Sequence, residues 1–203
     1  MIKLNNISYN INNKKIIKNI SLEIGTYGTT IFMGKNGAGK TTLLKIIANI
    51  LRPTSGSVKY SNNNIKCESS FLFQNHIFLD RSVKENLLHS LSCSNDYSFD
   101  SSINIIKDSL DQFDLLKYLS ANINELSLGE KQCISIIRSL ITKPKILFLD
   151  EPFNYLDQKY KTFSKDILKK FSKNHKIVLI THSNSDASFF SDDIFTISDG
   201  SLL

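Results

Sequence analysis

Eight consecutive residues combine glycines with a lysine and a hydroxyl residue at spacings that suit phosphate binding. The run Gly34-Lys35-Asn36-Gly37-Ala38-Gly39-Lys40-Thr41 matches G-x-x-x-x-G-K-[ST] at every fixed position. Glycines allow the backbone to curl tightly and direct successive N–H groups at phosphate oxygens, where a Cβ would obstruct the approach. Lys40 can reach the outer phosphates, the Thr41 hydroxyl can ligate Mg²⁺, and Thr42 is expected beside an inner phosphate.

Two adjacent carboxylates follow a short apolar run further along the chain. Ile146 to Leu149 reads as a buried strand, and Asp150 and Glu151 stand at its end. Asp150 can hold Mg²⁺ through water, whereas Glu151, pointing a different way, can orient the attacking water or accept its proton. In isolation the same residues would also suit a solvated acidic turn, but a phosphate loop in the same chain favours the catalytic interpretation.

The phosphate loop requires a strand before it and a helix after it, and the sequence predicts both. Thr30 to Met33 is an apolar run that enters the glycines. From Thr41 to Leu51 apolar residues recur at helical spacing, with Pro53 just beyond. The positive end of this helix, starting near Gly39, therefore faces the bound anion.

The remaining pattern alternates strands with helices, which favours a parallel sheet covered by helices. The middle of the chain, Val83 to Leu140, is mostly helical in pattern and is expected to form a helical subdomain. Other expected elements are strands at Ile2 to Tyr9, Ile16 to Ile24 and Ile177 to Ile180, a helix around Tyr160 to Phe171, a turn at Ser61 to Asn64 and a loop at Ser92 to Ser102.

Composition places the chain among globular proteins: 41% of its 203 residues are apolar and 22% are charged. No apolar run approaches the roughly 18 to 20 residues of a membrane helix, and the first ten residues read as a strand, so we expect a cytosolic protein. Cys67, Cys93 and Cys133 lack any C-x-x-C spacing and are expected to be reduced bystanders. The net charge of +6 is scattered along the chain, which indicates a solvated basic surface and no nucleic-acid partner.

A phosphate loop alone does not separate kinases, GTPases, helicases and transport ATPases. Over nearly all 203 residues, however, the order of motifs resembles the ATP-binding cassette ATPases. Tyr9 resembles the aromatic on which the family stacks adenine. Gln74, in Phe71-Leu72-Phe73-Gln74, resembles the glutamine that contacts the metal and the attacking water and senses the membrane subunit.

Three later motifs carry the same resemblance. Leu126-Ser127-Leu128-Gly129-Glu130 is similar to the signature sequence that closes over the γ-phosphate of the opposite protomer. Asn154-Tyr155-Leu156-Asp157 is similar to the loop that links the two sites, and His182 to the switch histidine. Leu128 departs from the family's usual L-S-G-G-Q, and we expect hydrolysis that is retained but slower, with Ser127 and Gly129 still suited to an anion.

The resemblance implies an α/β fold of the P-loop NTPase class, with a RecA-like, mainly parallel sheet, an N-terminal antiparallel portion and a helical subdomain. Residues 1–203 would form one ATPase domain, with an ATP-binding core at about 1–75 and 141–203 and the helical subdomain at about 76–140. It also implies ATP and Mg²⁺ as cofactors and a head-to-tail dimer of two ATPase subunits. In that dimer Lys40 and Asp150 of one protomer and Ser127 and Gly129 of the other enclose each nucleotide.

The function implied is an ATP-hydrolysing subunit of a transporter, lying on the inner face of the cell membrane. Its partners would be separate integral-membrane permeases and an extracytoplasmic solute-binding protein. The run 78–87 resembles small-solute importers, tungstate-type oxyanion importers among them. The alternatives are a haem-export cassette of cytochrome c maturation, a nontransport cassette ATPase and a nonhydrolysing subunit; intact Lys40, Asp150, Glu151 and His182 argue against the last.

Overall fold

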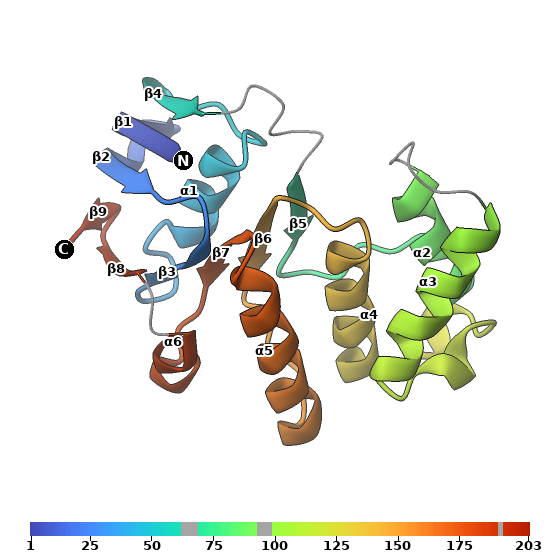
Figure 1. Cartoon of the computed structure of the whole chain (residues 1–203). Helices are drawn as coiled ribbons and strands as arrows, with labels where there is room; N and C mark the ends of the chain where they lie inside the picture. Colours follow the sequence, from blue (N-terminus) through green and yellow to red (C-terminus); the bar gives the residue numbers. More distant parts are fainter. Residues whose placement is uncertain (62–68, 93–98, 191–192) are drawn as a thin grey trace. The chain divides into compact units, whose positions relative to one another are not determined.

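The structure is a computed structural model that describes residues 1–61, 69–92, 99–190 and 193–203 (Figure 1). Its strands are β1 (Ile2–Ile11), β2 (Lys14–Ile24), β3 (Gly28–Met33), β4 (Ser55–Tyr60), β5 (Ser69–Leu72), β6 (Ile146–Asp150), β7 (Lys176–Ile180), β8 (Asp193–Ser198) and β9 (Ser201–Leu202). Its α-helices are α1 (Lys40–Ile47), α2 (Val83–Ser92), α3 (Phe99–Gln112), α4 (Leu128–Leu140), α5 (Gln158–Ser172) and α6 (Asn184–Phe190). Two 3-10 turns, η1 (Leu116–Tyr118) and η2 (Ile123–Glu125), precede α4.

The strands form two sheets. In the smaller one the order is β2-β1-β4, with β1 antiparallel to both neighbours. The larger sheet has the order β5-β6-β7-β3-β8-β9; β3 is parallel to β7 and β8, and β6 is parallel to β7. The mainly parallel sheet and the antiparallel N-terminal portion expected from the sequence are therefore both present.

The register of the parallel strands brings three chain segments to one edge of the sheet. Phe32 on β3 and Asp150 on β6 both lie opposite Ile180, the last residue of β7. Residues that follow these strands must therefore emerge side by side, as the carboxyl ends of β3, β6 and β7 show in Figure 1. In open α/β sheets this edge is where ligands bind.

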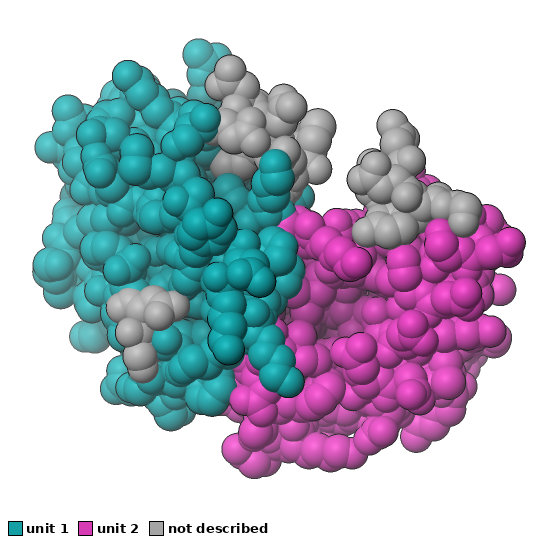
Figure 2. All heavy atoms as spheres, in the orientation of Figure 1, with its two compact units in different colours: residues 1–71, 145–151, 169–203 teal, residues 72–144, 152–168 magenta. Residues whose placement is uncertain are grey.

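The chain divides into two compact units, which Figure 2 shows in different colours. Unit 1 comprises residues 1–71, 145–151 and 169–203; unit 2 comprises residues 72–144 and 152–168. Unit 1 holds the antiparallel sheet, the parallel strands, α1 and α6. Unit 2 holds α2, α3 and α4, which contact one another, and each of these helices has buried apolar residues, such as Leu87, Leu110 and Ile137.

The core of unit 1 explains why α1 forms where it does. Leu43, Leu44 and Ile47 of α1 are buried in one cluster with Phe148 of β6 and Val178 of β7. These positions lie on one face of a helix, so burying them fixes the first turn of α1 against the sheet and beside the phosphate loop.

Two expected boundaries were wrong. The helix expected from Thr41 to Leu51 ends at Ile47, because Asn49 takes a left-handed φ of 56° and its N–H bonds Ile46 O. A loop was expected from Ser92 to Ser102, but Ser92 is the last residue of α2 and residues 99–102 form the first turn of α3. Ser102 is buried in α3 because it lies on the same helix face as buried Ile106 and Leu110. Residues 93–98 lie outside the described residues, as do residues 62–64 of the expected turn and Cys67 and Cys93. Cys133 is a free, buried thiol, and burial raises its pKa to about 12.

Among the described residues, no helix combines the length and the apolar character needed to cross a membrane.

Candidate functional site

The phosphate loop connects β3 to α1 and takes a backbone path that only glycine tolerates. Gly34 has a φ of 144°, and a Cβ there would lie 2.1 Å from the carbonyl oxygen of Ile197. Gly39 has a φ of 100°, and a Cβ there would lie 2.8 Å from Cδ1 of Ile17. The glycines expected from the motif are thus required by the left-handed backbone and by close neighbours.

Lys40 lies at the start of α1 with its ammonium folded over the phosphate loop. Its Nζ donates hydrogen bonds to Gly34 O at 2.8 Å and to Lys35 O at 3.0 Å, and the residue is buried. These two hydrogen bonds hold the positive charge of the Lys40 ammonium close to the carbonyl oxygens of the phosphate loop. Phosphate oxygens are stronger acceptors than neutral carbonyls, so an anion in the loop can take over the ammonium's donors.

Asp150 and Thr41 form the contact that joins the phosphate loop to the acidic pair. The Thr41 hydroxyl donates to Oδ2 of Asp150 at 2.8 Å. Oδ1 of the same carboxylate is buried and has no hydrogen-bond partner among the described residues. Burial raises the pKa of Asp150, opposed by the Thr41 hydrogen bond and by the charges of Lys45 and Lys40.

This pair fits a magnesium ion. Mg²⁺ prefers oxygen ligands and is commonly held by one or two protein oxygens together with substrate phosphates. A buried carboxylate oxygen without a donor, next to a hydroxyl at the mouth of a phosphate loop, offers that chemistry. Asp150 and Thr41 are therefore the residues that would hold the ion.

Glu151 turns away from Asp150 because its backbone is left-handed. Its φ is 52°, while its N–H still donates to Ile180 O at 3.1 Å and so continues the pairing of β6 with β7. The side chain is buried, and its Oε1 lies 2.9 Å from Nδ1 of His182. His182 follows β7 by two residues, so the sheet register brings the histidine to the acid.

The remaining candidates of unit 1 line the loop or its approach. Thr42 is half-buried in the first turn of α1, and Lys35, Asn36 and Gly37 are exposed, whereas Ala38 is buried. Tyr9 lies on β1 opposite Ile17 and packs partly buried against the core cluster. Its role in stacking adenine stays a prediction.

In unit 2, Ser127 and Glu130 form a capping box at the start of α4. The Ser127 hydroxyl donates to Oε2 of Glu130 at 2.7 Å, and Ser127 N donates to the same oxygen at 2.8 Å. A hydrogen bond with the Tyr118 side chain and those from Ser127 hold the pKa of Glu130 below its usual value, against the opposing effect of burial. The box fixes the α4 N-terminus and points the Ser127 hydroxyl at a carboxylate.

The next turn of α4 meets the loop after Glu151. A Cβ on Gly129 would lie 2.9 Å from the carbonyl oxygen of Tyr155, so the chain needs glycine there for close approach. Leu128, the departure from the usual signature, is 56% exposed, and Tyr155 is 59% exposed. Leu128 therefore adds an apolar side chain to the surface and takes no part in the core.

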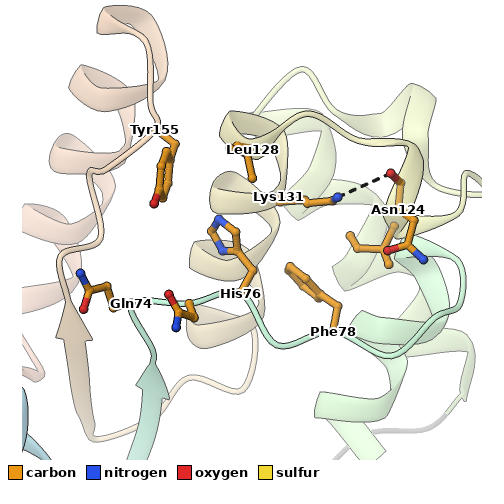
Figure 3. A pocket seen from close by; sticks show the side chains of 9 residues that line it. Gln74, His76, Phe78, Asn124, Leu128, Lys131 and Tyr155 are labelled. Atoms are coloured by element: carbon orange, nitrogen blue, oxygen red, sulfur yellow. Dashed lines mark hydrogen bonds between the residues drawn. The ribbon is translucent and has the colours of Figure 1, made fainter.

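Gln74 lines a cavity of about 370 Å³ that lies within unit 2 (Figure 3). His76 and Phe78 of the same segment, Leu128 and Lys131 of α4, and Tyr155 surround it. Nδ1 of His76 lies 3.4 Å from the Ser135 hydroxyl, whereas its buried Nε2 has no described partner. Burial, with smaller contributions from Lys131 and Arg138, lowers the pKa of His76.

Asp157 lies immediately before α5, and its Oδ1 accepts a hydrogen bond from Tyr160 N at 2.8 Å. The aspartate that the sequence assigns to the linking loop thus also satisfies a free N–H of the helix.

Three side chains that the sequence analysis did not single out lie in the surroundings of these candidates. Tyr118 bonds Glu130, and His76 shares the cavity with Gln74. Buried Gln132 donates to Pro152 O at 2.6 Å and so ties α4 to the loop after the acidic pair. Only Gln132 carried a signal, a polar residue within the apolar face of an amphipathic helix.

Two groups of candidates result, one in each unit. Unit 1 brings together the phosphate loop, Lys40, Thr41, Asp150, Glu151 and His182. Unit 2 brings together Ser127, Glu130 and Gly129, with Tyr155 and Gln74 among their surroundings.

A mainly parallel sheet with a phosphate loop after β3 and two carboxylates at the end of β6 is typical of proteins that bind nucleoside triphosphates. Residues 17–154 match the family described as ABC transporter, and the chain belongs to this family. It is 32% identical, over 214 residues, to the spermidine/putrescine import ATP-binding protein PotA of Borreliella afzelii, covering all of this chain and 61% of that protein. It is 30% identical, over 206 residues, to the sulfate/thiosulfate import ATP-binding protein CysA of Anthoceros angustus, covering 97% of this chain and 54% of that protein.

Solved structures agree with this assignment. A dimeric ATP-binding cassette, MJ0796, in a post-hydrolysis state bound to ADP and Pi, superposes with a TM-score of 0.88 at 26% identity, covering all of this chain and 96% of that one. The chain spans about three fifths of the length of the PotA relatives it matches, since it covers 61% of the first of them.

Proposed function

We propose that the chain binds ATP with Mg²⁺ and hydrolyses it as the nucleotide-binding subunit of a transporter. The observation that carries this proposal is the 2.8 Å contact between Thr41 and Asp150, which places a buried carboxylate at the mouth of the phosphate loop. The ADP and Pi held by the similar cassette support hydrolysis as the reaction.

Each residue of the unit 1 group has a separate task in this reaction. The loop's N–H groups and Lys40 bind and orient the phosphates, while Thr41 and Asp150 supply oxygens to the metal. When bound, Mg²⁺ would neutralise charge on the phosphates. Glu151, held beside His182 Nδ1, orients the attacking water and accepts its proton. Tyr9 is proposed to stack on adenine and Gln74 to contact the metal and the water.

We further propose that a second copy of the subunit completes each site with Ser127, Gly129 and Glu130, and that Asp157 links the two sites. The dimeric state of the similar cassette supports this arrangement. In the free chain the Ser127 hydroxyl is bonded to Glu130, so closure would transfer this donor from a carboxylate to the γ-phosphate. Residues at about 1–75 and 141–203 would then act as the ATP-binding core and residues at about 76–140 as the helical subdomain.

The proposed transport is import of a small solute, by permeases in the cell membrane to which the subunit binds on the cytoplasmic side. Both named relatives are import ATP-binding proteins, for a polyamine and for sulfate or thiosulfate. To test the direction, the gene is disrupted in its host and uptake of labelled polyamine, sulfate and molybdate is followed. Import predicts loss of uptake of one solute class; normal uptake of all three with loss of an exported product would contradict it.

Nucleotide binding is tested with a fluorescent ATP analogue titrated into the purified chain with and without Mg²⁺. The proposal predicts binding that Mg²⁺ strengthens, and Asp150→Asn should remove the metal effect while sparing metal-free binding. Lys40→Ala should weaken binding in both conditions. An Asp150→Asn protein that responds to Mg²⁺ as the unchanged protein does would contradict the assignment of Asp150.

A further inference from the structure

Asp80 links the segment that follows Gln74 to the residues that precede α4. Its Oδ1 accepts a hydrogen bond from Nδ2 of Asn122 at 3.0 Å and another from Nδ2 of Asn124 at 2.7 Å. The two amides come from residues 42 and 44 positions further along the chain, and all three side chains belong to unit 2. One carboxylate oxygen therefore holds two side chains at η2, the 3-10 turn before α4.

Asn122 passes this restraint to the backbone of η2. Its Oδ1 accepts a hydrogen bond from Asn124 N at 2.8 Å, so the amide of Asn122 is bonded through both its oxygen and its nitrogen. Lys131 of α4 holds the same turn, because its Nζ donates to Asn124 O at 3.5 Å, as Figure 3 shows. Ser127, the N-cap of α4, follows η2 by two residues. The carboxylate of Asp80 therefore acts on the turn from which α4 begins.

The backbone on both sides of Asp80 is itself held by a buried side chain, that of Asn86 in α2. Oδ1 of Asn86 accepts a hydrogen bond from Leu79 N at 2.9 Å. Its Nδ2 donates to Leu79 O at 3.0 Å and to Ser82 O at 3.1 Å. A buried polar network whose members are bonded makes a segment rigid. Asp80 is thus presented to the two amides from a backbone that is already fixed.

Arg138 of α4 holds the same segment nearer to Gln74. Its Nη1 donates to Ile77 O at 2.6 Å, and its guanidinium carbon lies 4.5 Å from the centroid of the Phe78 ring. Both contacts are favourable, one as a hydrogen bond from a charged donor and the other as a cation–π interaction. Residues 77–82 are therefore bonded to α4 directly through Arg138 and to the turn before α4 through Asp80.

We propose that Asp80 is a positioning residue that fixes the turn before α4 and thereby the placement of Ser127. This role rests on the proposed function, in which Ser127 of one copy approaches the nucleotide of the other. The side chains that Asp80 holds belong to unit 2, whereas the phosphate loop and Asp150 belong to unit 1. Removing the Asp80 carboxylate should therefore slow hydrolysis without weakening the binding of ATP to a single chain.

Hydrogen exchange of the full chain without nucleotide measures the restraint directly. Asp80→Ala should speed amide exchange in residues 124–127 by at least about tenfold, since losing a hydrogen bond to a charged group shifts a local equilibrium by about that much. Asp80→Asn keeps a carbonyl oxygen that can accept both amides and should restore most of the protection. Asp108→Ala is the matched control, because it removes an exposed aspartate of α3 in the same unit. Equal exchange in Asp80→Ala and the unchanged protein would overturn the proposal.

Activity measurements separate positioning from a role in stability alone. In Asp80→Ala the affinity for a fluorescent ATP analogue should match that of the unchanged protein. Its rate of phosphate release at saturating ATP should fall at least about tenfold, because a misplacement of about 1 Å can cost about 100-fold in rate. Asp80→Asn should recover most of that rate.

A normal rate in Asp80→Ala, or a loss of ATP binding in proportion to the loss of rate, would overturn the positioning role. If the unchanged protein bound no ATP or did not hydrolyse it, the proposed function would fail. The exchange measurement needs no nucleotide, so it would still decide whether Asp80 holds the turn before α4.

Discussion

Nδ1 of His182 lies 2.9 Å from Oε1 of Glu151, and the two side chains reach each other from the ends of neighbouring parallel strands. Glu151 is 8% exposed, whereas the His182 side chain is 61% exposed. The histidine therefore forms the solvent side of a contact whose acid is buried. A carboxylate can only accept, so with ionised Glu151 the histidine Nδ1 is the donor.

Glu151→Gln should reduce ATP hydrolysis by at least about 100-fold, since general base catalysis contributes about 10² to 10⁴. Binding should persist, because the phosphate loop is unchanged. Phosphate release measures the rate, and light scattering with ATP should detect a longer-lived dimer. His182→Ala serves as the comparison and should reduce the rate less. A Glu151→Gln protein that turns over normally would exclude Glu151 as the base.

Asp150→Asn should raise the Tm of the nucleotide-free protein while abolishing Mg²⁺-dependent hydrolysis. Burial raises the pKa of Asp150 above its ordinary value of 3.8, so the folded chain holds this proton more tightly than the unfolded chain. Stability from this group is complete at low pH and is lost as the pH rises through the folded pKa. The difference in Tm between the variant and the unchanged protein should therefore grow as the pH rises above the ordinary pKa of 3.8. A difference that is constant or falls with pH would contradict it.

Leu128→Gly should increase the basal rate of hydrolysis several-fold. Leu128 is exposed at the first position of α4, so its loss removes bulk from the face proposed to cover the γ-phosphate and leaves the core intact. Leu128→Ala separates the effect of bulk from the helix cost of glycine, about 1 kcal/mol. The expectation that the leucine slows turnover fails if both variants are as slow as the unchanged protein, and an inactive unchanged protein would refute retained hydrolysis.

Glu130→Gln should lower the ATP concentration at half-maximal rate. Glu130 accepts the Ser127 hydroxyl and places a negative charge beside the group proposed to approach the γ-phosphate. Glutamine still accepts the bonds of the capping box, so the Tm should change little. Ser127→Ala is the contrasting variant, because loss of the N-cap should cost about 1 kcal/mol of stability. An unchanged or higher half-saturation in Glu130→Gln would indicate that its charge does not oppose the nucleotide.

Much of unit 1 was predictable because its signals are local. The glycines of residues 34–39 and the apolar run before Asp150 indicate their own backbone conformation without reference to distant residues. The observed strands β3, β6 and β7 confirm the strands expected there. The end of α1 was not predictable, since Ile50 and Leu51 continue the helical period although Asn49 has already left the helix. Apolar residues can continue to recur at helical spacing beyond the point where one left-handed residue has ended the helix, so the spacing alone does not locate the last helical residue.

By itself the sequence determined which residues carry phosphate and metal chemistry. The glycines of the phosphate loop and the two adjacent carboxylates are each contiguous in the chain, so their backbone and chemistry depend on residues only a few positions apart. Only the tertiary structure decided which side chains meet. The contact of Thr41 with Asp150 joins residues that are 109 positions apart in the chain, and the contact of Glu151 with His182 depends on the register of β6 and β7. Such contacts depend on the order and register of strands in a sheet, and no local pattern of residues encodes that order.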